Sequence, residues 1–335
     1  MSPRGRIIPI FVPHLGCPND CVFCNQRKIS GSLFPAAGAD VTSVLQEAKS
    51  WSPPAELAFY GGSFTAIPLA QQRELLAAAR PFYAGGFLTG IRVSTRPDAM
   101  APEALAQLEE FGVQTVELGA QSMDDAVLQR CGRGHSAAQT VEAVRLLRTR
   151  GFRVVLQMMT GLPGSDPAGD LETARRIAAL QPEGVRIYPT VVLQDTPLYE
   201  LWRRGLYKAH SVEDAVETCA PILRLFQEAG IPVLRLGLNP TEELRGGAAA
   251  AGAYHPALGE LVHARLYLED ARRLLRQAGP PGRAELQVHP RCLSKLLGQK
   301  RENLRILQAE FALETLNVVK NSALEPGKLA IRDLT

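Results

Sequence analysis

Short β-prone runs alternate with helical patterns from the start of the chain to about residue 237. In the helical segments apolar positions recur every three or four residues, whereas the runs between them are short, apolar and rich in β-branched residues. The predicted strands are Ile7–Val12, Glu56–Tyr60, Ile91–Ser94, Thr115–Leu118, Val154–Met158, Gly184–Tyr188 and Pro232–Leu236, and the predicted helices are Thr42–Ser50, Leu69–Tyr83, Pro102–Phe111, Ala137–Arg150, Asp170–Leu180 and Val212–Ala229.

Repeated strand–helix units predict a parallel sheet, because each parallel strand pair needs a crossover helix. About six such units favour an open or closed α/β barrel, in which the chemistry lies on loops at the carboxyl ends of the strands.

The pattern changes after Asn239-Pro240. Two helical patterns, Ala257–Gln277 and Leu293–Gln308, surround a predicted strand at Glu285–Val288, and alternation predicts another at Leu313–Val319. We therefore expect a barrel domain over residues 1–239 and a smaller α+β addition over 240–335, which serves as a substrate-binding or accessory domain.

Composition narrows the function classes only slightly. The hydrophobic fraction of 46% and the charged fraction of 21% are ordinary for a globular protein, and the net charge of +3 does not demand a nucleic-acid partner. No segment approaches the roughly 18 apolar residues of a membrane span, and the first residues lack the pattern of a signal peptide. We expect a cytoplasmic protein without membrane contact.

Three of the six cysteines, Cys17, Cys21 and Cys24, follow the first predicted strand with the spacing Cys-x3-Cys-x2-Cys. A long intracellular chain does not need disulfides, so this group indicates metal binding or redox chemistry. Thiolates are the usual ligands of iron–sulfur clusters, and three thiolates on a four-iron cluster leave one iron open for a small molecule. The scattered Cys131, Cys219 and Cys292 are interpreted as small buried hydrophobic residues.

A zinc site with His14 as a fourth ligand is the competing interpretation. Zinc sites usually combine a Cys-x2-Cys with a distant second pair, and this sequence has no second pair. A non-catalytic iron–sulfur or zinc-binding protein also remains an alternative.

The cysteine spacing, with the aromatic Phe23 before the last cysteine, resembles the signature of the radical S-adenosylmethionine (SAM) superfamily. The resemblance implies a partial (β/α)6 barrel of radical SAM type, a [4Fe–4S] cluster on the three cysteines, and SAM on the open iron. It also implies an electron donor such as flavodoxin or ferredoxin, and cleavage of SAM to a 5′-deoxyadenosyl radical that abstracts hydrogen from the substrate.

Further motifs that follow predicted strands match places where this superfamily holds SAM. By resemblance, Gly61, Gly62 and Ser63 approach the amino end of SAM. The third residue of this motif is usually acidic in the superfamily, and here it is the serine. A hydroxyl and a guanidinium after the third strand suit ribose and carboxylate. The residues implied as SAM-binding are Phe23, Gly61, Gly62, Ser63, Ser94, Arg96, Glu117, Gln121 and Arg133.

The combination Ser94–Asp98, Glu117–Ser122 and Arg133–His135 is most similar to the radical SAM domain of the Elongator subunit 3 (Elp3-like) group, which modifies the wobble uridine of tRNA. Only 95 residues follow Pro240, and they contain no Gly-rich acetyl-CoA loop, so we expect a relative without the acetyltransferase domain. A basic run that could contact tRNA phosphates comprises Arg291, Lys295, Lys300, Arg301 and Arg305, although a run of this kind is more often a solvated helix face.

The alternative enzyme class is an anaerobic coproporphyrinogen oxidase-like or haem-handling protein. Those relatives usually carry an additional cysteine four positions after the third motif cysteine, where this chain has Lys28. The sequence therefore favours tRNA over a porphyrinogen as the substrate.

Overall fold

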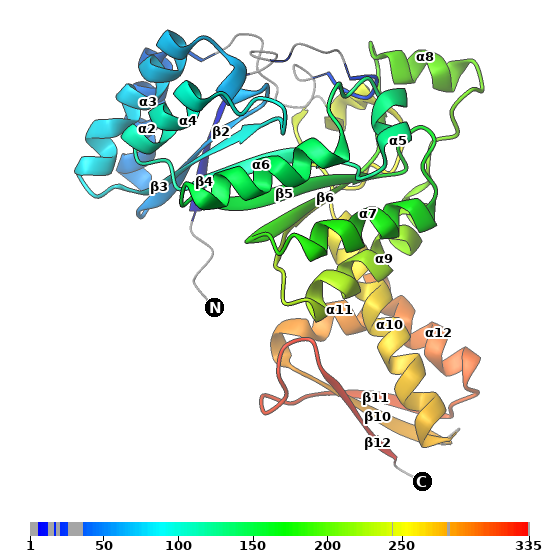
Figure 1. Ribbon diagram of the computed structural model, residues 1–335. Coiled ribbons are helices and arrows are strands. Elements are labelled where there is room, and N and C mark those ends of the chain that lie inside the picture. The colour runs from blue at the N-terminus through cyan, green and yellow to red at the C-terminus, as the bar shows by residue number, and fades with distance from the viewer. Residues whose placement is uncertain are drawn as a thin grey trace.

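The computed structural model describes residues 6–12, 17, 21–25, 36–242, 244–279 and 282–333. The two residues of the sequence analysis that belonged to alternative interpretations, His14 and Lys28, lie outside this part of the chain. Two lobes are visible in Figure 1, a larger one built by the first two thirds of the chain and a smaller one below it.

The larger lobe is built on a parallel sheet of seven strands in the order β1-β2-β3-β4-β5-β6-β8. Neighbouring strands pair in parallel throughout, as the crossover helices require. The sheet curls into a half-barrel whose edges are β1 and β8, as the sequence predicted. The strands are β1 (Arg6–Phe11), β2 (Ala55–Tyr60), β3 (Leu88–Thr95), β4 (Thr115–Gln121), β5 (Arg153–Thr160), β6 (Gly184–Pro189) and β8 (Val233–Leu236).

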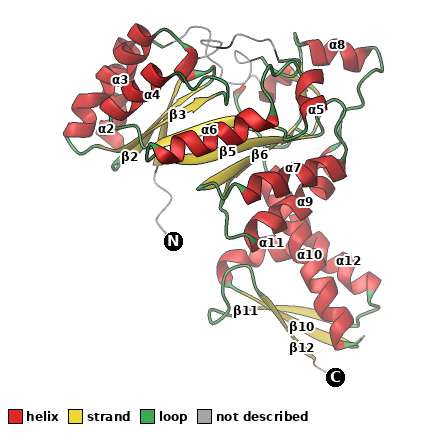
Figure 2. Cartoon of the chain, viewed as in Figure 1, coloured by secondary structure: helices red, strands yellow, loops and turns green. Residues whose placement is uncertain are grey.

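Helices cover the outer face of this sheet (Figure 2), and an apolar core fills the space between the two layers. Several begin at N-caps that the sequence supplies: Ser136 and Ser211 form reciprocal capping boxes with the residue three positions later, and Asp166 accepts from a backbone N–H. The helices of this lobe are α2 (Gly38–Trp51), α3 (Leu69–Ala84), α4 (Pro102–Glu110), α5 (Asp125–Arg130), α6 (Ala137–Thr149), α7 (Pro167–Ala179), α8 (Pro197–Arg203) and α9 (Val212–Glu228), with a 3₁₀ turn at Phe64–Ala66.

The smaller lobe packs helices on a three-stranded sheet of order β11-β10-β12, parallel between β10 and β11 and antiparallel between β10 and β12. It contains the α+β mixture expected after residue 240. Its elements are α10 (Leu258–Ala278), β10 (Arg283–Val288), α11 (Leu293–Leu297), α12 (Glu302–Glu310), β11 (Thr315–Lys320) and β12 (Leu329–Asp333), with 3₁₀ turns at Pro290–Cys292 and Gln299–Arg301.

The predicted helix Leu293–Gln308 is two helices. Gly298 ends α11 with a φ of 69°, and Lys300 and Arg301 have φ values of 48° and 61°. Both cations therefore lie in the left-handed region, which interrupts a helix. The buried amide of Asn303 stabilises the break, because its Nδ2 donates to the carbonyls of Leu296 at 3.0 Å and Ala264 at 2.8 Å.

A small antiparallel sheet connects the segments on either side of residue 240. β7 (Val191–Leu193) pairs with β9 (Ala249–Gly252), which follows a π-helical turn at Leu244–Ala248. The sequence analysis did not predict these strands. β9 consists of alanine and glycine, which have low strand propensity, and β7 is only three residues long. Pairing across this point makes the limits 1–239 and 240–335 less sharp than the composition change suggested, and the domain division stays a prediction.

No helix in the described residues has the length and apolar character that crossing a membrane requires.

Candidate functional site

A cavity of about 490 Å³ lies inside the half-barrel and reaches the carboxyl ends of its strands. Ten of the twelve residues that the sequence analysis assigned to the cluster or to SAM line it, from five separate segments of the chain. They are Cys17, Cys21, Phe23, Cys24, Gly61, Gly62, Ser94, Arg96, Gln121 and Arg133. The other two, Ser63 and Glu117, are fully buried behind the wall.

The cysteine segment is anchored on both sides. The N–H of Val22 donates to the carbonyl of Cys131 at 3.1 Å, and the N–H of Leu198 donates to the carbonyl of Val22 at 2.8 Å. A turn follows, in which the N–H of Cys24 bonds the carbonyl of Cys21 at 2.9 Å. Residues 21–25 thus lie between the end of α5 and the start of α8.

The three motif cysteines line one cavity, and the Arg133 guanidinium lines it with them. Arg133 donates from Nη1 to the sulfur of Cys21 at 3.3 Å. Burial and the neighbouring Cys21 raise the pKa of the Cys17 thiol, whereas Arg96 and Arg133 oppose that rise. Within the described ranges no three Cys, His, Asp or Glu side chains are already gathered as a metal site. The donor set itself fits a [4Fe–4S] cluster, because three thiols and a charge-compensating guanidinium face the same space.

Hydroxyl groups buttress the glycine pair after β2. Gly61 has a φ of 89°, which favours glycine there. Behind it, the Ser63 hydroxyl hydrogen-bonds the Thr95 hydroxyl at 2.9 Å and accepts from the N–H of Arg96 at 3.2 Å. The Thr95 hydroxyl also bonds that of Thr65 at 2.6 Å. The structure therefore gives Ser63 a supporting position, joining the loop after β2 to the end of β3.

Arg96 is held in a fixed orientation at the wall. Its Nε and Nη2 donate to the two carboxylate oxygens of Asp98, each at 2.9 Å, and Nη2 also reaches the carbonyl of Arg133. Burial disfavours the charged carboxyl, but Arg96 outweighs it and holds the pKa of Asp98 below its ordinary value. The Arg96 side chain is 3% exposed, and no hydrogen-bond partner for its buried Nη1 is present among the described residues. A cavity-lining donor without a partner is suited to an anionic ligand group.

The end of β4 carries a second cavity-lining polar group without a partner among the described residues, the side-chain amide of Gln121. Gln121 has a φ of 63° at an irregularity in the β4–β5 pairing, and its buried Oε1 has no partner in the described part of the chain. Gly119 leaves room for it, since a Cβ there would lie 2.8 Å from Nε2 of Gln121 and 3.2 Å from Nη2 of Arg133. The Arg133 Nη2 donates to the Gly119 carbonyl at 2.6 Å. The Nε2 of His135 lies 3.2 Å from the carbonyl oxygen of Ala120. Burial, with Arg133 nearby, lowers the pKa of His135 to about 4, so its imidazole is neutral.

Glu117 is the centre of an ionic network deeper in the half-barrel. Its carboxylate accepts from Arg92 Nη1 at 2.8 Å, and from Arg186 Nε at 2.7 Å and Nη2 at 3.0 Å. The Tyr60 hydroxyl at 3.0 Å and the Gln157 amide at 3.2 Å complete five hydrogen bonds. Burial disfavours the charge, but Arg186 and Arg92 together hold the pKa of Glu117 below its ordinary value. Tyr60, Gln157 and Arg186 line the cavity, so Glu117 supports its wall from behind.

Some cavity residues were not assigned to the site from the sequence. Gly119 and Thr95 sit within quoted motifs, yet only the packing shows their roles. Arg235 on β8 lines the cavity as well. Its signal was a charge inside the apolar run Val233-Leu234-Arg235-Leu236, the same signal that singled out Glu117.

The predicted tRNA-contacting cations lie in the smaller lobe, on the segment from the 3₁₀ turn at Pro290–Cys292 to α12. All are exposed except the partly buried Lys295, and they comprise Arg291, Lys295, Lys300, Arg301 and Arg305.

A curled parallel half-barrel with three motif cysteines at its open end defines a class of enzyme, and family models agree. Residues 11–177 match the model of the radical SAM superfamily, and residues 182–268 match a radical SAM C-terminal domain. The chain belongs to the radical SAM superfamily.

Within the superfamily the chain is similar to Elp3 proteins. It is 38% identical over 128 residues to the tRNA uridine(34) acetyltransferase of Methanocaldococcus jannaschii, covering 37% of this chain and 24% of that protein. It is 33% identical over 180 residues to Elongator complex protein 3 of Homo sapiens, covering 53% of this chain and 32% of that protein. These matches span only a quarter to a third of the relatives.

The fold is that of a solved archaeal relative. The structure of Methanocaldococcus infernus Elp3 with an N-terminal deletion matches with a TM-score of 0.62 and 23% sequence identity, over 79% of this chain and 63% of that one.

Proposed function

We propose that the chain binds a [4Fe–4S] cluster through Cys17, Cys21 and Cys24, cleaves SAM reductively, and directs the radical at a tRNA. One observation carries the proposal. The three motif thiols share a cavity wall with Arg96 and Gln121, whose buried Nη1 and Oε1 have no hydrogen-bond partner among the described residues.

The residues around the cavity divide the work of holding SAM. The Arg96 guanidinium, fixed by Asp98, is suited to the SAM carboxylate. Gln121 offers an acceptor for the amino group or ribose, and Ser94 a hydroxyl at the same wall. Gly61 and Gly62 let the backbone approach the ligand closely, and Phe23 adds an apolar surface beside the thiols.

The chemistry that a reduced cluster supplies when bound is one electron, with which SAM is cleaved to methionine and a 5′-deoxyadenosyl radical. This chain's residues supply orientation and charge. Arg133 joins the Cys21 sulfur to the β4 end that carries Gln121, so one guanidinium positions the metal ligand and the SAM wall together. The buried walls of the cavity exclude water from a reactive radical.

Two observations support tRNA as the substrate. The similar proteins are named for modification of tRNA uridine 34 or as Elongator subunits. The exposed cations of the smaller lobe are also suited to phosphate contacts, and they do not line the cavity.

Anaerobic reconstitution with iron and sulfide tests the cluster. We expect about four irons per chain, and loss of iron and of the cluster's visible absorbance when any motif cysteine is replaced by alanine. Cys292→Ala is the matched control, because that thiol is buried in the smaller lobe. A protein that takes zinc and no iron would contradict the proposal.

The substrate is tested by 5′-deoxyadenosine release under a chemical reductant, which makes the assay independent of whether flavodoxin or ferredoxin is the natural donor. Bulk tRNA should stimulate the release, and coproporphyrinogen should not. Stimulation by the porphyrinogen alone would replace tRNA with the alternative substrate, and an intact cluster without SAM cleavage would indicate a non-catalytic iron–sulfur protein.

A further inference from the structure

Part of the cavity wall comes from the two edge strands of the half-barrel, β1 and β8, and from the segment that follows β8. We call this part of the wall the β1–β8 end. This end is mainly apolar, as ligand sites usually are, with a few polar groups among the apolar ones. Its lining comprises Ile7, Pro9, Phe11, Leu234 and Leu238, with Tyr188, Arg235, Asn239 and Thr241 as the polar members.

Arg235 is held rigidly by the main chain. Its Nε donates to the carbonyl of Gly237 at 2.9 Å, and its Nη2 donates to the carbonyl of Leu238 at 2.7 Å. Gly237, with a φ of 85°, forms the turn that brings these carbonyls together. In the described chain no carboxylate forms an ion pair with Arg235, so its orientation is set without its charge being neutralised.

The neighbouring charges do not neutralise it either. Arg92 and Arg186 share Glu117, and Arg92 also pairs with Glu56. With Arg235, three guanidiniums face two carboxylates in this part of the half-barrel, which leaves one positive charge. Burial, and to a lesser degree Arg186, lower the pKa of the Arg235 guanidinium, although an arginine remains charged at neutral pH. A partly buried cation with no carboxylate partner among the described residues is suited to an anionic ligand.

We propose that the β1–β8 end of the cavity is a substrate subsite in which Arg235 binds an anionic group, a phosphate or carboxylate, while the apolar walls contact the body of the substrate. The inference rests on the proposed function for its choice of substrate. With tRNA as the substrate, the anion is a phosphate of the nucleotide that enters the cavity, and the cofactor end remains free for SAM.

The test compares uridine 5′-monophosphate with uridine, which differ only in the phosphate. Binding is measured by anaerobic equilibrium dialysis on the reconstituted, SAM-loaded protein. A charge-assisted hydrogen bond contributes about 1.5–3 kcal/mol, so the nucleotide should bind roughly 10–100 times more tightly than the nucleoside. Arg235→Gln should bring that ratio close to one, and Arg235→Lys should keep part of the preference.

Arg245→Gln is the control, because that arginine is exposed in the turn before β9 and does not line the cavity. The ratio of the two affinities is unaffected by partial unfolding, since both ligands report on the same folded molecules. An unchanged ratio in Arg235→Gln, or no preference for the nucleotide in the wild type, would overturn the subsite. If Arg235→Gln instead weakens the binding of coproporphyrinogen while neither uridine compound binds, the anion subsite stands and the tRNA proposal fails.

Discussion

The carboxylate of Glu117 should be among the most sensitive polar groups in the protein. Its side chain is fully buried, and the Arg92 and Arg186 side chains that flank it are 12% exposed. In Glu117→Gln the shape is retained, but an NH₂ group replaces one acceptor oxygen and faces guanidinium N–H donors. Arg186 is then left without a carboxylate partner in the described chain, while Arg92 keeps Glu56, and leaving a buried charge unpaired costs about 3–5 kcal/mol of unfolding free energy.

This loss of unfolding free energy lowers the melting temperature, Tm. An unfolding entropy of about 2.1 cal/mol/K per residue gives roughly 0.7 kcal/mol/K for 335 residues, so Tm should fall by about 4–7 °C. Differential scanning calorimetry of the purified chain at neutral pH measures it.

The pH dependence provides a second signature. Since the pKa of Glu117 is lowered in the folded state, its contribution is present above its unfolded pKa of about 4.3 and is lost as pH falls through the folded value. The difference in Tm between wild type and Glu117→Gln should therefore shrink on acidification below that range.

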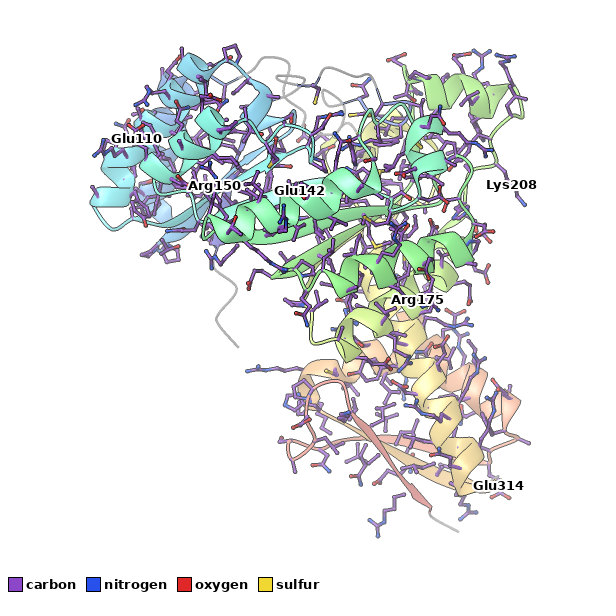
Figure 3. The ribbon with its side chains drawn as sticks, in the orientation of Figure 1. Glu110, Glu142, Arg150, Arg175, Lys208 and Glu314 are labelled. Carbon is purple, nitrogen blue, oxygen red and sulfur yellow. The ribbon has the colours of Figure 1, made fainter. Side chains whose placement is uncertain are left out.

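Glu110→Gln is a matched control. Its carboxylate meets Arg73 at 2.7 Å, but the two side chains are 47% and 52% exposed, and Figure 3 shows Glu110 at the outer edge of the molecule. Water and salt screen such pairs, so no resolvable shift is expected. If Glu117→Gln melts with the wild type, or shifts no more than this control, the network does not stabilise the half-barrel and the reasoning is refuted.

Three further predictions concern the cluster, the exposed cations that we propose contact tRNA, and the backbone. Arg133→Gln should keep its iron but shift the cluster to a more negative reduction potential, since a hydrogen bond and a positive charge at a ligand sulfur are lost; an unchanged midpoint in an anaerobic redox titration would argue against this. Reversing Lys300 and Arg301 to Glu should weaken tRNA binding and flatten its salt dependence by about one unit of slope per lost phosphate contact, with iron content unchanged. Gly161→Ala should cost at least about 1–2 kcal/mol in denaturant unfolding, because its φ is 69° and a Cβ would lie 2.7 Å from Nδ1 of His210; equal stability would show that the loop adapts.

The half-barrel was predictable because its signals are local. Each strand is a short apolar run, and each helix shows its own periodicity and often its own cap, as at Ser136 and Ser211. The break near Gly298 was not predictable from periodicity, because the apolar spacing continues through it while Lys300 and Arg301 adopt left-handed backbone that Asn303 stabilises from elsewhere.

The candidate site likewise has one part that local sequence signals predict and one part that depends on contacts between distant residues. The cysteine motif and the cavity-lining motifs are contiguous in sequence, so their residue types alone indicate their chemistry. The environment of Glu117 is not contiguous in sequence, since Arg92 and Arg186 lie 25 and 69 residues away, and the order of the strands in the curled sheet brings them together. For the same reason, the sequence marked Glu117 as unusual without showing that it supports the wall from behind.

Helix α10 carries one consequence beyond the site. Its first half places Val262 and Leu266 in the core of the half-barrel, and its second half places Leu268, Ala271 and Leu275 in the core of the smaller lobe. A helix of 21 residues is about 31 Å long and bends little, so the two cores are connected by a single stiff rod. Truncation after residue 239 would remove part of the larger lobe's own interior, and a displacement of α10 in the smaller lobe would move side chains packed against the seven-stranded sheet.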